Sequence, residues 1–69
     1  MVKERAGAMQ LADLITDKIG VTGLEIVVRK DHAYGWQPVV VVAPGDLIGY
    51  QRRAEEIANR LRIRFDLRD

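Results

Sequence analysis

The chain has 69 residues, of which 48% are hydrophobic and 30% are charged. This composition is typical of a globular protein, and the length predicts a single small domain that spans residues 1–69. The 11 basic and 10 acidic residues leave a net charge of +1, so charge alone does not indicate a polyanionic partner.

The sequence contains no cysteine. This excludes a disulfide framework, a cysteine-ligated zinc site and a thiol nucleophile. No apolar run approaches the roughly 20 residues that a membrane helix needs, and the first residues do not resemble a signal peptide. We therefore expect a cytoplasmic protein that does not enter a membrane.

Residues 3–19 predict a first helix, because apolar side chains recur there at helical spacing. Gly20 follows the last of them, at a position where glycine can adopt the left-handed conformation that ends a helix. Gly7 weakens the first two turns, so a later start is also compatible with the pattern. The apolar stripe consists of Ala8, Leu11, Ala12, Ile15 and Ile19.

Two strands are predicted next, at residues 24–30 and 38–43. In the first strand, apolar residues such as Ile26 and Val28 alternate with a mostly polar set. The second strand holds a run of valines after Pro38, which places apolar side chains on both of its faces. Residues 31–37 are expected to form a wide hairpin loop between the two strands.

A second helix is predicted from Asp46, whose carboxylate can cap the first turn, to about residue 59 or 60. Residues 61–68 then alternate strictly between apolar and charged side chains. This alternation predicts a final strand with Ile63 and Phe65 facing inward.

The order α-β-β-α-β predicts an α+β two-layer sandwich. The first two strands should be antiparallel, and a right-handed crossover through the second helix makes the final strand parallel to the valine strand. We therefore expect a three-stranded mixed sheet with the valine strand central and both helices on one face.

The other face of this sheet has no cover within the chain, and it is the main candidate site. Three interpretations of this face are open. It is a solvated surface on which arginine stems lie across valines, or it is an interface for a second copy or another protein. The third interpretation is a nucleic-acid-binding surface. We favour association, because an apolar centre with a polar rim is typical of interfaces and so small a core benefits from it. The outward valines are either Val39 with Val41 or Val40 with Val42. The candidate interface consists of Val27, Arg29, Val39, Val41, Arg62 and Arg64.

Binding of RNA or another nucleic acid is the alternative function. The arginines of the open face could contact phosphates. However, sheets that bind RNA usually stack bases on aromatic side chains, and Phe65 is expected to point inward. The arginines are therefore present without a stacking platform.

The loop between the strands is a second candidate site. His32, Tyr34 and Trp36 lie close together in it, and the expected topology brings Arg60 nearby. Clustered aromatic residues are typical of recognition loops, but also of side chains that close the end of a core. We favour the packing role and keep His32, Tyr34, Trp36 and Arg60 as a candidate recognition loop.

The sequence contains no evident catalytic constellation. The single histidine, beside Asp31, lacks the further groups that acid–base or nucleophilic catalysis requires, and no carboxylates are spaced around it as metal ligands. We therefore expect a small non-enzymatic interaction module, without cofactor or metal, that forms a homodimer or docks to a protein partner.

Overall fold

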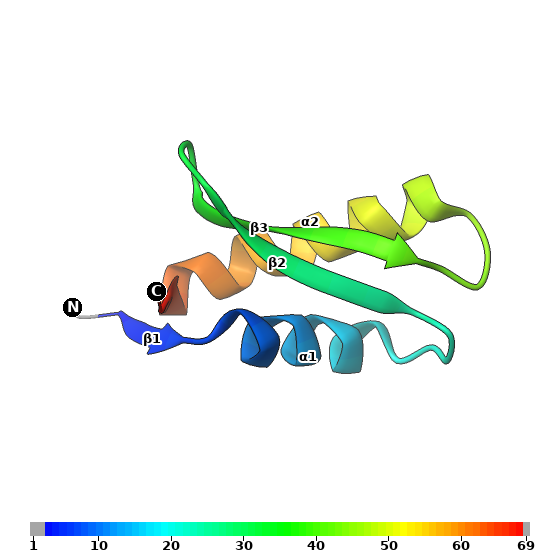
Figure 1. Cartoon of the computed structure of the whole chain (residues 1–69), viewed down its shortest axis with the longest axis horizontal. Helices are drawn as coiled ribbons and strands as arrows, with labels where there is room; N and C mark the ends of the chain where they lie inside the picture. The colour runs from blue at the N-terminus through cyan, green and yellow to red at the C-terminus, as the bar shows by residue number, and fades with distance from the viewer. Residues whose placement is uncertain (1–2, 69) are drawn as a thin grey trace.

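The computed structural model describes residues 3–68, and within them the chain forms two helices and four strands of an α+β fold (Figure 1). In chain order the elements are β1 (Glu4–Ala6), α1 (Ala8–Ile19), β2 (Glu25–Asp31), β3 (Gly35–Val42), α2 (Leu47–Arg64) and β4 (Phe65–Leu67). The α+β class is thus confirmed, but the three-stranded mixed sheet is wrong. The strands form two separate pairs, an antiparallel β2–β3 hairpin and a parallel β1–β4 pair.

The N-terminal part of the predicted helix is a strand. Gly7 is the N-cap of α1 and has an extended backbone, with φ −72° and ψ 158°. Its carbonyl accepts the first helical hydrogen bond, from the amide of Leu11 at 3.0 Å. Because the chain is extended before Gly7, β1 can pair with β4 at the other end of the sequence, with Arg5 opposite Asp66.

The remainder of α1 follows the predicted pattern. Leu11, Ala12 and Ile15 are its buried residues, and they come from the expected apolar stripe. Gly20 ends the helix in the left-handed conformation with φ 72°, as predicted, and its amide donates to the carbonyl of Thr16.

The connection between the two central strands is shorter than the predicted wide loop. The carboxylate of Asp31 accepts hydrogen bonds from the amides of Ala33, at 3.2 Å, and Tyr34, at 2.8 Å. Gly35 then takes a φ of 89°, a conformation that glycine adopts without a steric penalty. The turn is therefore confined to residues 32–34, and Trp36 and Pro38 belong to β3.

The second helix begins as predicted but ends later. The side chain of Asp46 accepts from the amide of Ile48 at 3.2 Å, which confirms the N-cap. The helix then continues through residues 61–64, which were predicted to be part of a strand. Ile63, which was expected to face inward, is 74% exposed on this helix.

The final strand therefore pairs differently from the prediction. Only Phe65–Leu67 is extended, and it runs parallel to β1 and not beside the valine strand in a common sheet. The amide of Arg68 donates to the carbonyl of Ala6 at 2.8 Å, which continues the link between the two ends of the chain.

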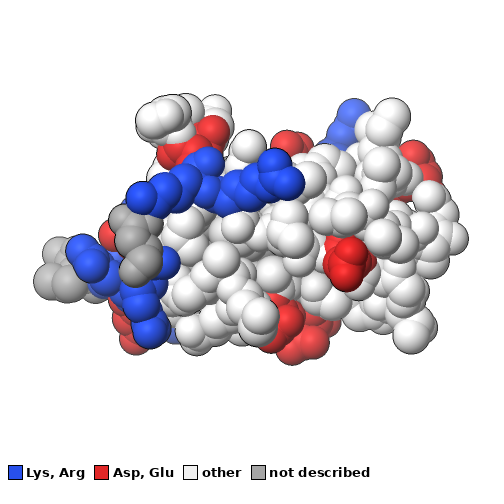
Figure 2. Space-filling model, viewed as in Figure 1, with Lys and Arg blue, Asp and Glu red and all other residues white. Residues whose placement is uncertain are grey.

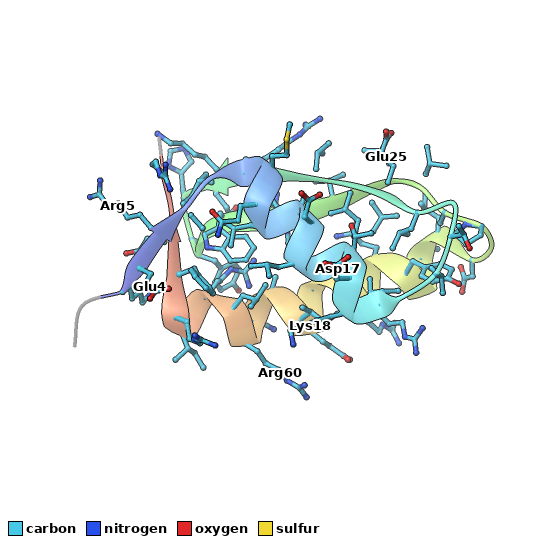
Figure 3. All side chains as sticks on the ribbon, turned by 90° about the horizontal axis from the view of Figure 1, so that it is seen from below. Glu4, Arg5, Asp17, Lys18, Glu25 and Arg60 are labelled. Carbon is cyan, nitrogen blue, oxygen red and sulfur yellow. The ribbon has the colours of Figure 1, made fainter. Side chains whose placement is uncertain are left out.

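The core lies between the hairpin and the helices. Helix α1 packs against β2, α2 packs against β3, and the two helices contact each other. Figure 3 shows both helices on one side of the hairpin. Trp36, Leu11, Ile15 and Pro38 are the largest fully buried side chains. In the part of the chain that the structure describes, neither helix combines the length and apolar character that crossing a membrane requires.

Candidate functional site

The face of the hairpin that points away from the helices is the first candidate site, and we call it the open face. Along β2 and β3, buried and more exposed side chains alternate, so one set points into the core and the other set outward. The outward set consists of Glu25, Val27, Arg29, Gln37, Val39 and Val41. Glu25 projects away from both helices (Figure 3).

The centre of the open face is apolar. Val27 and Val39 lie directly opposite each other in the register of the hairpin, and both are half-buried. Opposed side chains on one face of an antiparallel pair are in contact distance. Arg29 lies opposite Gln37 in the same register, so polar groups border the valine pair at one end.

The register of the hairpin, with a β-bulge at its end, and the burial of Val40 identify the valines that point outward. The partner of Glu25 is Val42 and the partner of Ile26 is Val40, so Val41 has no direct partner on β2. Val40 is buried in the core, whereas Val41 and Val42 are 49% and 50% exposed. Val39 with Val41 is therefore the outward pair, and the bulge exposes Val42 as well.

Two of the predicted interface residues do not belong to the open face. Arg62 and Arg64 were assigned to it as members of a final strand, but both lie in the last turn of α2. Among the six candidate residues, Arg29 is the arginine that remains on the open face. The basic rim that was expected along the final strand is therefore wrong.

Arg62 instead forms a cluster with the aromatic residues of the hairpin. Its Nε donates to the carbonyl of Trp36 at 2.8 Å. Its guanidinium lies 5.1 Å from the ring centroid of Tyr34 and 5.1 Å from that of Trp36. Such cation–π contacts contribute about 0.5–1 kcal/mol each at partly exposed sites. Through these contacts, Arg62 holds the end of α2 against the start of β3.

The four residues of the candidate recognition loop do not form one site in the structure. Trp36 is 1% exposed, and its Nε1 donates to the carbonyl of Phe65 at 3.2 Å, so its role is in the core. Tyr34 is 68% exposed, and His32 lies exposed in the turn. Arg60 is exposed and points away from the fold (Figure 3). The cation that joins the aromatic pair is Arg62, which was predicted to lie on the sheet.

A shallow hollow of about 240 Å³ lies beside this cluster. Its lining residues are Tyr34, Gln37, Glu55, Asn59 and Arg62. The lining is polar and mixed in charge, and the Arg62 guanidinium is already engaged with Asn59 and with the carbonyl of Trp36. The hollow offers less apolar surface for a partner than the open face does.

Charge is distributed unevenly over the molecule. Figure 2 shows most lysine and arginine side chains of this view at the end where both termini lie (Figure 1) and in a band that extends from there toward the middle, whereas acidic side chains are scattered over the surface. Within residues 3–68, no group of three or more histidine, aspartate or glutamate side chains is arranged to hold a metal ion.

No protein-family model, curated protein or solved structure matches this chain.

Proposed function

We propose that this chain is a small non-enzymatic interaction module that associates with protein, a second copy of itself or another chain, through the open face. The observation that carries this proposal is the pair of Val27 and Val39. These side chains lie opposite each other on a face that no helix of residues 3–68 covers. Val41, 49% exposed, extends the apolar surface toward the end of β3.

The composition of the open face supports association over simple solvation. Its centre is aliphatic, and Glu25, Arg29 and Gln37 border it. An apolar centre with a polar border is the usual anatomy of a protein interface. Val41 is 49% exposed, so burying the rest of its side chain contributes about 0.7 kcal/mol, half of the roughly 1.5 kcal/mol for a fully exposed valine.

The nucleic-acid alternative has less support. A sheet surface that binds RNA needs cations for phosphates and aromatic rings for bases. Of the predicted arginines, Arg29 is on the open face, and no aromatic side chain of β2 or β3 points outward there. Tyr34 is exposed, but it belongs to the turn and stacks with Arg62.

Solution mass tests the proposal. At rising protein concentration, light scattering after size-exclusion chromatography should give a mass above the 7.8 kDa of one chain. The double variant Val27→Lys with Val39→Lys should stay at the mass of one chain, because two charges then occupy the apolar centre. Circular dichroism establishes that the variant is folded.

The matched control is Ile48→Lys with Ile63→Lys, which places the same two charges at aliphatic residues of α2 that are each 74% exposed. This control should associate like the unchanged protein. If the double variant associates as strongly as the control does, the open face is not the contact surface and the proposal is wrong.

A further inference from the structure

The open face carries two opposite charges at equal distances from its apolar centre. Glu25 lies two residues before Val27 on β2 and Arg29 lies two residues after it, so all three share this face. At about 3.3 Å per residue, each charged residue is about 7 Å from Val27 along the strand. Within residues 3–68, Glu25 and Arg29 are exposed and neither has an ion-pair partner. Both charges are therefore available to a partner on this face.

This spacing fits a second copy of the same face. A two-fold axis that lies between two packed sheets and runs across the strands reverses the direction of β2. Val27 then faces Val27 of the second copy, and each Glu25 faces Arg29 of the other copy. Packed sheets are about 10 Å apart, a gap that a glutamate and an arginine side chain can bridge together. Two complementary ion pairs thus border one apolar centre.

The twist of packed sheets preserves these pairs. Two sheets with aligned strands cross at about 30°. At about 7 Å from the axis, this rotation displaces a residue sideways by about 4 Å, which long side chains can follow. A crossing of about 90° would displace it by about 10 Å and separate the charges. The ion pairs therefore require the aligned packing.

The charges also select between the two aligned orientations. A two-fold axis parallel to the strands keeps the direction of β2. Both copies of Glu25 then lie at one end of the interface, and both copies of Arg29 lie at the other end. Like charges brought together across an interface are destabilising. The antiparallel orientation is the one in which each charge meets its opposite.

We propose that the partner of the open face is a second copy of this chain, packed face to face with the two β2 strands antiparallel and joined by two Glu25–Arg29 ion pairs. Val27 and Val39 of both copies form the centre of this contact, because they lie opposite each other in each hairpin. The helices lie on the two outer sides of the dimer, since both are on the other side of the hairpin (Figure 3). This assignment rests on the proposed function, and it names the partner and its orientation.

The contact is small, because the hairpin is two strands wide. Stable interfaces bury about 1,600 Å² in total, and contacts below about 1,200 Å² are typical of weak, transient complexes. We therefore expect a dissociation constant on the order of 10 μM, and association should be followed up to about 1 mM protein.

Charge reversal tests the ion pairs. Glu25→Arg and Arg29→Glu should each raise the dissociation constant about threefold to tenfold, because each change sets like charges opposite at both ends of the contact. In an equal mixture of the two variants, both pairs are reformed between unlike copies. The mixture should therefore associate to within about twofold of the unchanged protein.

The matched controls are Glu56→Arg and Arg52→Glu, which make the same charge changes at exposed positions of α2. Each control should change the dissociation constant by less than about twofold, alone or in a mixture. These controls separate the proposed pairs from the general effect of net charge.

Cross-linking tests the orientation, and the chain has no native cysteine to interfere. In the proposed dimer, residue 25 of one copy is about 10 Å from residue 29 of the other and about 17 Å from residue 25 of the other. A dimaleimide that spans about 10 Å should link a mixture of Glu25→Cys and Arg29→Cys at least about tenfold faster than it links either variant to itself. With the β2 strands parallel, each variant alone would be linked.

The two proposals fail in different ways. If Val27→Lys with Val39→Lys abolishes association, but the charge reversals match their controls and each cysteine variant links to itself as fast as the mixture, the antiparallel pairing is wrong while the open face stands. If the unchanged protein keeps the mass of one chain up to about 1 mM, a second copy is not the partner of the open face. If association persists in Val27→Lys with Val39→Lys, both proposals are wrong.

Discussion

Gln51 occupies the outer edge of β3, which faces away from β2. From α2, its side-chain amide donates to one backbone group of β3 and accepts from another, at 2.9 and 2.8 Å. A primary amide carries one acceptor and one donor group, so it can replace a short piece of a neighbouring strand. In the sequence, Gln51 is an ordinary polar residue of an amphipathic helix, and nothing in the local pattern indicates this contact.

Removing this side chain should therefore destabilise the fold. In Gln51→Ala, the amide of Val40 and the carbonyl of Pro38 lose their partners at residues that are themselves buried. We expect the free energy of unfolding to fall by about 1–2 kcal/mol, measured by urea denaturation at one fixed protein concentration. Arg52→Ala, at the next and exposed position, should change it by less than about 0.5 kcal/mol. Equal effects of the two variants would contradict a structural role for the Gln51 bonds.

Arg62 was assigned to the wrong site because the predicted C-terminal end of the second helix came too early. Buried Ala54 and Ala58 are four residues apart, and Arg62 follows at the same interval. On a continuous helix these positions share one side, so Arg62 faces the hairpin and reaches Trp36. With the helix ended at residue 59 or 60, the same arginine was assigned to the open face and Arg60 to the aromatic cluster.

At the scale of elements, strong periodicity gave correct predictions and ambiguous periodicity did not. The stripe of α1, the valine strand and the Asp46 cap were predicted correctly. Residues 61–68 alternate like a strand, but Leu61 also continues the helical spacing of Ala54 and Ala58. No glycine or proline interrupts the chain after Gly49, so nothing local stops the helix before Phe65.

The short β1 strand has no signal that a sequence pattern could reveal. It is three residues long, and Glu4 and Arg5 are exposed. Its extended form depends on pairing with β4, from the other end of the chain. Contacts of this kind are tertiary, and local propensity does not encode them. The turn at residues 32–34 was missed for a different reason, because the Asp31 carboxylate tightens a loop whose composition suggested a wider one.

The sequence was sufficient to predict those residues of the open face whose placement depends only on the alternation of side chains along the hairpin. Val27, Arg29, Val39 and Val41 lie on one face, as the period of two requires. Which valines point outward could not be decided from a run of identical residues. The structure decides it, because Val40 is buried in the core and Val39 lies opposite Val27. The contact of Gln51 with the outer edge of β3 could not be predicted either, because it depends on a side chain that α2 carries to that edge.

At the scale of the whole molecule, small size is the dominant constraint. A domain of this length buries only about 60% of its unfolded surface, and a two-stranded hairpin is marginal by itself. Here the helices cover one face of the hairpin and the other face is open. Covering this open face by association would remove its valines from water, so association and folding stability should be coupled.

This coupling predicts a melting temperature that depends on protein concentration. A ligand that binds only the folded state stabilises it by mass action, and a second copy acts as such a ligand. For a domain of this size, about 1 kcal/mol shifts the melting temperature by roughly 4–8 °C, so a hundredfold rise in concentration above the dissociation constant should raise it by about 5 °C or more. Differential scanning calorimetry of the unchanged protein beside the Val27→Lys, Val39→Lys variant measures this directly. The variant should melt at one temperature throughout, because it has no association to lose on unfolding. If the melting temperature of the unchanged protein is equally constant, at concentrations where light scattering detects dimer, the two copies meet without stabilising each other's fold. Association through the open face would then be wrong.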